Sequence, residues 1–202
     1  MRKKVGIISL VLIILFTSAC SKDNTEGKVE EVSYQETTEK TNYIKIEMQS
    51  GDLMLLELYP DKAPITVANF QKLVENKFYD NLTFHRIVEN FMIQGGDPEG
   101  TGRGGSDETI KGEFLNNGVT NTISHERGVI SMARNGVDMN SASSQFFICH
   151  ADVPSLDGDY AAFGKLIAGF NTLDKLAKTA VNGETPINPP KIKSIRFINI
   201  EK

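Results

Sequence analysis

Apolar and polar residues alternate in short segments along most of the chain after residue 42. Residues 43–48 alternate between apolar and charged side chains, residues 50–52 are typical of a turn, and residues 53–58 form a second apolar segment. This order predicts a β-hairpin. Residues 192–200 predict a final strand. Further short apolar segments alternate with turns rich in Gly, Asn, Asp and Ser. The apolar segments include 84–93, 128–133, 145–150 and 161–166, and the segments 95–105 and 112–114 between them are rich in Gly and polar residues.

Two segments have apolar residues at helical spacing. A proline opens the first segment, 64–77, and its apolar residues recur three or four positions apart. The second segment, 171–178, places Leu173, Leu176 and Ala177 on one face. Strands and helices do not alternate repeatedly, so a doubly wound parallel sheet is excluded. The pattern predicts a mainly β fold, an antiparallel barrel or sandwich, with two helices.

Residues 1–19 have a different pattern, typical of an export signal. Basic residues at 2–4 precede an almost unbroken apolar run at 5–16 and small residues at 17–19. The apolar run is shorter than the ~20 residues of a membrane-spanning helix. A buried helix is the alternative. We favour the signal because nothing else near the terminus could cover such a helix.

Cys20 follows this segment directly. A cysteine in this place resembles the lipobox of bacterial lipoproteins, although Thr17 stands where that family usually has an aliphatic residue. The resemblance implies cleavage before Cys20 and a diacylglycerol on its thiol, with the protein anchored to the cell membrane on its extracytoplasmic face. Several acyl chains would anchor it stably, because each buried CH₂ contributes ~0.8 kcal/mol. Plain secretion is the alternative.

Residues 20–42 are polar and acidic, with few aliphatic side chains to offset the entropy of ordering. We therefore expect a lipidated cysteine and a disordered tether up to residue 42, followed by one folded domain at 43–202. The composition, 40% hydrophobic and 24% charged, is that of a globular protein.

The charge of the chain excludes one class of partner. Residues 1–19 contain three basic and no acidic side chains, so their removal changes the formal charge from −4 to −7. No basic cluster follows Lys4, which excludes nucleic acid as a partner because phosphates require Lys or Arg. Cys149 lies in an apolar segment, and a modified Cys20 leaves it without a disulfide partner. We expect it in the core.

Three further kinds of chemistry have little support in the sequence. The glycines of 100–105 are not followed by the Lys-Ser or Lys-Thr of a phosphate-binding loop. His85, His125 and His150 are too scattered for a zinc site. The Gly-x-Ser-x-Gly motif is absent, although a hydrolase that uses Ser144 or His125 remains an alternative.

One short stretch combines a cation, apolar side chains and an amide. Arg86, Phe91 and Gln94 follow one another at spacings of five and three residues. A strand with an irregular step at 89–90 would bring them to one groove. Such a groove suits a neutral peptide.

Five separated motifs occur in the order Phe-His-Arg-Ile-Val (84–88), Phe-Met-Ile-Gln-Gly-Gly-Asp (91–97), Gly-Val-Ile-Ser-Met-Ala (128–133), Ser-Gln-Phe-Phe-Ile (144–148) and Leu-Asp-Gly-Asp-Tyr-Ala-Ala-Phe-Gly (156–164). Together they resemble the cyclophilin family of peptidyl-prolyl cis/trans isomerases, and the resemblance covers residues 43–202. It implies a closed eight-stranded antiparallel β-barrel capped by two α-helices. The groove then lies on the outer face, because side chains fill a barrel of this size.

The resemblance also implies roles for individual residues. Arg86 corresponds to the catalytic arginine and Gln94 to its hydrogen-bonding neighbour. Two departures are Arg134, where many eukaryotic members have Asn, and Ser155, where drug-sensitive members have Trp. The substrate-binding positions are Phe91, Met92, Phe147 and Leu156 around the proline ring, His85 and Tyr160 at its edge, and Ala133, Arg134, Asn135 and Gln145 along the substrate chain.

The activity implied is rotation about X-Pro bonds of exported proteins, which would assist folding outside the cytoplasmic membrane. We expect a monomer that needs neither metal nor other cofactor. A permanently charged, planar arginine suits this reaction because no proton has to be transferred. The alternative is a non-catalytic peptide-binding chaperone or adhesion module, which would not need Arg86, Phe91 and Gln94 together.

Overall fold

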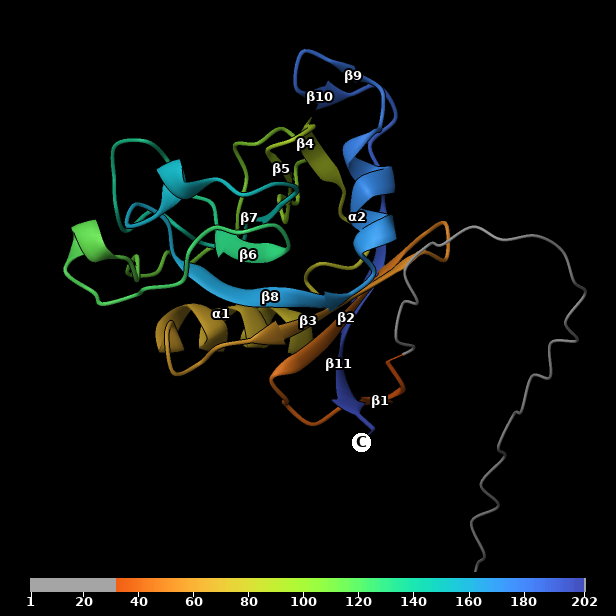
Figure 1. The fold of residues 1–202 in the computed structure, drawn as a ribbon, viewed down its shortest axis with the longest axis horizontal. Helices are drawn as coiled ribbons and strands as arrows, with labels where there is room; N and C mark the ends of the chain where they lie inside the picture. The colour runs from red at the N-terminus through yellow and green to blue at the C-terminus, as the bar shows by residue number, and fades with distance from the viewer. Residues whose placement is uncertain (1–31, 202) are drawn as a thin grey trace, which may run out of the picture. The chain divides into compact units, whose positions relative to one another are not determined.

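The computed structural model describes residues 32–201, which form eleven strands, two α-helices and two short 3₁₀ helices (Figure 1). No helix in this range is long and apolar enough to cross a membrane. The helices are α1 (Pro64–Glu75), α2 (Phe170–Ala177), η1 (Leu115–Asn117) and η2 (Pro154–Leu156). The strands are β1 (Tyr34–Thr37), β2 (Tyr43–Met48), β3 (Leu53–Leu58), β4 (Phe84–Val88), β5 (Met92–Gly95), β6 (Val129–Met132), β7 (Phe146–Cys149), β8 (Ala162–Ala168), β9 (Val181–Asn182), β10 (Thr185–Pro186) and β11 (Ile192–Ile200).

Nine strands form one antiparallel sheet in the order β1-β11-β2-β3-β8-β6-β7-β5-β4, and β9 and β10 form a separate small hairpin beside β4 (Figure 1). The predicted hairpin at 43–58 is β2–β3, with Ile46 opposite Met54. Its turn uses Gly51 at a φ of 87°, a backbone conformation that glycine adopts without strain. The predicted final strand at 192–200 is β11.

The main core is built from inward side chains of the sheet and of both helices. Ile44 and Ile46 of β2 and Leu56 of β3 are completely buried. Phe70 of α1 packs with its ring centre 5.1 Å from that of Phe163 of β8. Both predicted helices are confirmed, and their buried residues include the apolar positions that the spacing indicated: Val67, Phe70, Leu73 and Val74 in α1, and Leu173, Leu176 and Ala177 in α2.

The first turn of α1 is capped by a residue far away in the sequence. Ala63, which precedes the helix, makes no side-chain cap. The buried carboxylate of Glu113 instead accepts hydrogen bonds from the backbone N–H groups of Ile65 and Thr66, at 3.0 and 2.7 Å. These N–H groups have no partner inside the helix, and a negative charge at this end is also favoured by the helix dipole.

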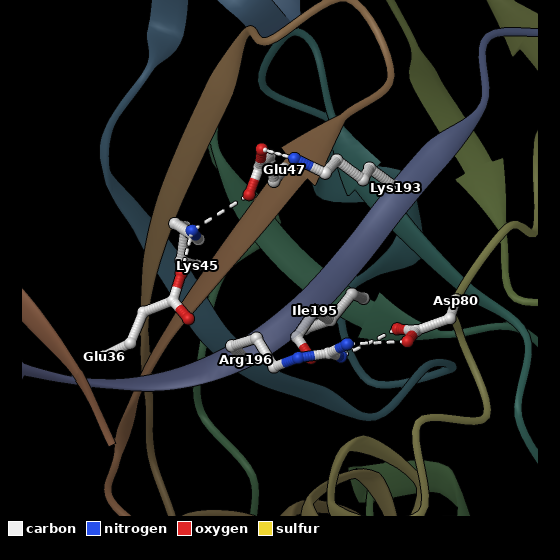
Figure 2. A network of polar contacts seen from close by, with 7 residues as sticks. All are labelled: Glu36, Lys45, Glu47, Asp80, Lys193, Ile195 and Arg196. Atoms are coloured by element: carbon white, nitrogen blue, oxygen red, sulfur yellow. Dashed lines mark hydrogen bonds and ion pairs between the residues drawn. The ribbon is translucent and has the colours of Figure 1, made fainter. Parts of the chain in front are cut away.

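Polar contacts attach β1 to the sheet (Figure 2). Buried Lys45 of β2 contacts the carboxylates of Glu36 on β1 and Glu47 on β2. Although burial acts to lower it, the pKa of Lys45 is raised, because both carboxylates favour the ammonium form. Arg196 of β11 also forms an ion pair with Asp80, with 2.6 Å between Nη2 and Oδ2. The two side chains face each other in Figure 2. The predicted tether extended to residue 42, but its described part contains β1, which pairs with β11 and belongs to the folded domain.

The mainly β architecture with two helices is confirmed, whereas the predicted closed barrel is not. Within residues 43–201 the sheet has eight strands, and β1 adds a ninth. The strands at its two ends, β1 and β4, do not pair with each other. An isolated bridge between Thr83 and Lys191 and a 2.8 Å bond from Ile192 N–H to the Leu82 carbonyl link the segments that lead into β4 and β11. These contacts do not form a continuous ladder.

A second, smaller apolar cluster lies on the opposite face of the sheet from the main core. Met92 of β5 and Phe147 and Cys149 of β7 are buried in it. Met92 lies opposite Cys149 in antiparallel register, so these side chains share one face. Cys149 is buried as predicted, and burial raises the pKa of its thiol to about 12. Partly buried residues packed against this cluster are Val88, Phe91, Ala133, Leu156 and Tyr160.

Candidate active site

The β4–β5 hairpin places Arg86 and Gln94 side by side. The two residues are directly opposite in antiparallel register, so their side chains project from the same face. Nη1 of Arg86 donates a hydrogen bond to Oε1 of Gln94 at 3.2 Å. The irregular step predicted within a strand is a tight turn between two strands, with Asn90 at a φ of 60°. Asparagine tolerates this conformation better than most residues.

A small recess of about 90 Å³ opens beside Arg86. Its floor is formed by Met92 and Phe147, which are 1% and 4% exposed. The ring of Tyr160 meets that of Phe147 edge-on, with 5.7 Å between the ring centres. The recess therefore combines an apolar floor with a cation at its rim. It is lined by Arg86, Phe91, Met92, Gln94, Ala133, Arg134, Phe147, Leu156 and Tyr160.

A larger recess of about 330 Å³ adjoins the first, because Gln94, Ala133 and Arg134 line both. Its other lining residues are mostly small or polar, and include Asn135, Gln145 and the glycine-rich loop 102–105. The two recesses together form an extended groove. All predicted catalytic and substrate-binding residues except His85 line one of the two recesses.

His85 lies outside the lining of both recesses. Its side chain is buried, and neither ring nitrogen has a hydrogen-bond partner within the described range. The ring is close to Gly102, where an added Cβ would lie 3.7 Å from it. Burial lowers the pKa of His85, so the imidazole is neutral at pH 7. The structure thus places His85 beneath the groove loop and not at the edge of the recess.

Two amide side chains continue the contact that begins at Arg86. Nε2 of Gln94 donates to Oε1 of Gln145 at 2.8 Å, and Nε2 of Gln145 donates to the carbonyl oxygen of Gly104 at 2.7 Å. Each amide is used at both its oxygen and its nitrogen, which defines its orientation. A continuous series of hydrogen bonds therefore runs from Arg86 to the glycine-rich loop.

Buried Asp97 holds that loop in place. Its carboxylate accepts hydrogen bonds from the backbone N–H groups of Glu99, Thr101 and Gly102 at 2.8, 2.9 and 2.6 Å. Burial acts to raise the pKa of Asp97, but these bonds outweigh it and the pKa is lowered. A Cβ at Gly104 would collide with the same carboxylate, so the close approach requires glycine there.

Arg134 is held against aromatic rings at the edge of the groove. Its Nε donates to the carbonyl oxygen of Asp159 at 2.9 Å. Its Cζ lies 4.9 Å from the ring centre of Tyr160 and 5.3 Å from that of Phe114, distances typical of cation–π contacts. Arg134 therefore helps to fix Tyr160 as a wall of the small recess.

Glu184 contacts Arg86, which the sequence did not predict. Nε of Arg86 donates to Oε2 of Glu184 at 2.6 Å. Glu184 lies between β9 and β10, 98 residues further along the chain. No motif or periodicity marks it in the sequence, because only the fold of the β9–β10 hairpin beside β4 brings it to the site.

A Ser-His-Asp arrangement is present but inaccessible. Nδ1 of His125 lies 2.8 Å from Asp157, and its Nε2 lies 3.1 Å from Oγ of Ser131, the order of groups in a hydrolase triad. Ser131 and His125 are 0% and 1% exposed, and the ring of Phe147 stacks on His125. Ser144 is also completely buried, so neither serine could meet a peptide.

Within residues 32–201 no group of three or more His, Cys, Asp or Glu side chains could hold a metal ion.

The groove therefore has the features of a peptide-binding site, with a fixed cation beside an apolar pocket. The serine of the described triad is not accessible from it. A family model described as cyclophilin type peptidyl-prolyl cis-trans isomerase/CLD matches residues 43–197. The chain belongs to this family and is a peptidyl-prolyl cis-trans isomerase.

Individual relatives agree with this assignment. The chain is 46% identical over 145 residues to peptidyl-prolyl cis-trans isomerase B of Bacillus subtilis, covering 72% of this chain and 93% of that protein. It is 41% identical to peptidyl-prolyl cis-trans isomerase-like 1 of Gibberella zeae, over 80% of this chain and 98% of the relative. The longer isomerase-like 2 protein of the same organism matches over 32% of its length.

A solved structure shows the same fold. It is a cyclophilin type peptidyl-prolyl cis-trans isomerase of Cryptosporidium parvum, crystallised in the presence of the dipeptide Ala-Pro. The two chains superpose with a TM-score of 0.70 and 34% sequence identity, over 79% of this chain and 99% of that chain.

Proposed function

We propose that this isomerase acts on X-Pro bonds of exported proteins, and that Arg86, oriented by Gln94, supplies the catalytic group. The observation that carries the proposal is the 3.2 Å contact between these two side chains at the rim of the apolar recess. It places a fixed hydrogen-bond donor next to a pocket of the kind that accepts a proline ring.

The chemistry of the reaction explains why an arginine suffices. Rotation about an X-Pro bond requires loss of C–N resonance, with a barrier of ~18–20 kcal/mol. In the twisted state the proline nitrogen regains a lone pair. A donor beside that nitrogen therefore stabilises the transition state more than the planar ground state. A guanidinium supplies its donors from a rigid plane and transfers no proton in this reaction, so no titratable acid is needed.

The apolar recess supplies the second part of the mechanism. Met92 and Phe147 hold the proline ring, so the carbonyl side of the bond turns against a fixed end. The same side chains exclude water, which strengthens the interaction of Arg86 with the reacting nitrogen. The larger recess, with Ala133, Asn135 and Gln145, holds the neighbouring residues of the substrate chain.

The export part of the proposal rests on residues 1–20, which lie outside the described residues. It is supported by the basic, apolar and small-residue pattern that ends at Cys20. We propose a lipid-anchored monomer outside the cytoplasmic membrane, with proline-containing exported polypeptides as its substrates. Mass spectrometry of the mature amino terminus tests this. An acylated Cys20 is expected, and an unmodified terminus would indicate plain secretion instead.

Client folding tests the proposed activity. The purified protein should accelerate the refolding of an exported protein whose folding is limited by proline isomerisation, and the Arg86→Ala protein should not. The alternative is a peptide-binding chaperone that needs no turnover. The larger recess supports it, because this recess could hold a peptide without any catalytic step. Full rescue of client folding by Arg86→Ala in cells that lack the protein would favour that alternative.

A further inference from the structure

We propose that Glu184 is a positioning residue that holds the guanidinium of Arg86 in the orientation the reaction requires. The inference rests on the proposed catalytic role of Arg86. Glu184 lies in the turn of the β9–β10 hairpin, outside the five motifs from which the site was predicted.

Arg86 is held at two different nitrogens. Its Nε donates to Glu184 at 2.6 Å, and its Nη1 donates to Gln94 at 3.2 Å. Because a guanidinium is planar and rigid, hydrogen bonds from two of its nitrogens to two different residues fix both its position and the tilt of its plane. Within residues 32–201 its third nitrogen, Nη2, makes no hydrogen bond to protein, and Arg86 lines the small recess. Nη2 therefore remains available for a substrate.

The main chain also couples Glu184 to Arg86. The N–H of Ile87, the residue after Arg86, donates to the carbonyl oxygen of Glu184 at 2.9 Å. Across the hairpin, Ile187 N–H bonds to the carbonyl oxygen of Ala180, also at 2.9 Å. Glu184 thus lies in a hydrogen-bonded hairpin that is itself bonded to the strand of Arg86. These backbone hydrogen bonds hold the carboxylate of Glu184 next to the guanidinium.

Stability alone is a poor reason for this pair. The two side chains are 37% and 55% exposed, and ion pairs with such exposure contribute little to folding because water and salt screen them. The hydrogen bond from Arg86 lowers the pKa of Glu184, because the bond favours the charged carboxylate. The pair can orient Arg86 even if it contributes little to the free energy of folding, because the reaction depends on the direction in which the donor points.

Glu184→Ala tests the inference by peptide isomerisation. Its kcat/KM should fall by roughly twofold to fivefold, the range for loss of a partly exposed charged partner. Glu184→Gln, which keeps an acceptor oxygen, should recover at least half of the loss. Glu89→Ala is the matched control: Glu89 is an exposed carboxylate in the β4–β5 turn, and its loss should leave kcat/KM unchanged.

The Arg86→Ala background separates the two roles. Glu184→Ala should cause no further loss there, since its effect passes through Arg86. The Nε–Hε resonance of Arg86 in a ¹H–¹⁵N spectrum should shift and exchange faster with water in Glu184→Ala, as expected when its acceptor is removed. Wild-type or higher kcat/KM in Glu184→Ala, or an equal loss in both backgrounds, would overturn the inference. Full activity in Arg86→Ala would instead refute the proposed role of Arg86.

Discussion

Gln94 joins Arg86 to Gln145, with its oxygen 3.2 Å from Nη1 of Arg86 and its nitrogen 2.8 Å from Oε1 of Gln145. Because both ends of the amide are used, Gln94 has one defined orientation. Gln94 therefore orients Arg86 and is itself oriented by Gln145. This series of hydrogen bonds ends at the backbone carbonyl of Gly104 in the glycine-rich loop.

Loss of either amide should reduce activity through Arg86. We expect Gln94→Ala to lower kcat/KM by about tenfold and Gln145→Ala by about threefold, because each weakens the orientation of the guanidinium. The double variant should lose less than the product of the two single losses, since part of the effect of Gln145 on activity passes through Gln94. Gln35→Ala, at an exposed amide on β1, is the control. Fully additive losses would show that Gln145 acts independently.

Asp97→Asn should destabilise the protein by about 1–3 kcal/mol at pH 7, because a buried carboxylate that accepts three backbone hydrogen bonds is lost. The pKa of Asp97 is lower in the folded protein than in the unfolded chain. The contribution of Asp97 to the free energy of unfolding is therefore complete above the pKa in the unfolded chain, about 4, and is lost as the pH falls through the pKa in the folded protein. Denaturation curves at several pH values measure this, with exposed Asp107→Asn as control. A difference that persists unchanged into the acid range would contradict the assignment.

Glu113→Ala should cost about 1–3 kcal/mol of unfolding free energy, because two N–H groups at the start of α1 lose the carboxylate that accepts their hydrogen bonds. Glu113→Gln should cost less, since one acceptor oxygen remains. The midpoint of urea denaturation measures both. Glu108→Ala, which removes an exposed surface pair with Lys72, should stay within about 0.5 kcal/mol of wild type. Equal effects at 108 and 113 would rule out the proposed cap.

Cyclosporin should inhibit this isomerase weakly. Ser155 is exposed on η2 next to Leu156, which lines the small recess, and it stands where drug-sensitive members have Trp. A serine lacks both the large contact area and the N–H donor of an indole. Inhibition titrations of wild type and Ser155→Trp test this, and the variant should be the more sensitive. Submicromolar inhibition of the wild-type protein would contradict the prediction.

Local signals in the sequence predicted the elements that depend on local structure. The β2–β3 hairpin, β11 and both helices follow from alternation, helical spacing and turn residues. Arg86 and Gln94 could be proposed together because one hairpin contains both. By contrast, Phe147 and Tyr160 come from distant segments, and only the order of the family motifs pointed to them.

Contacts between polar residues far apart in sequence were not predictable. The cap of α1 by Glu113 and the pair of Glu184 with Arg86 involve single charged residues with no periodicity around them. Strand β1 is polar, and its pairing with β11 and the contact of Glu36 with buried Lys45 arise only in the folded chain. His85 was expected at the edge of the recess, but the strand turns its ring beneath Gly102.

The most direct test of the central claim is the kcat/KM of Arg86→Ala on a proline peptide, measured on protein whose melting temperature matches that of wild type. If Arg86 contributes about 3–4 kcal/mol to transition-state stabilisation, kcat/KM should fall by roughly 10² to 10³-fold. Arg86→Lys should recover only a small part, because an ammonium cannot reproduce the planar donor. A kcat/KM within twofold of wild type for Arg86→Ala would contradict the account.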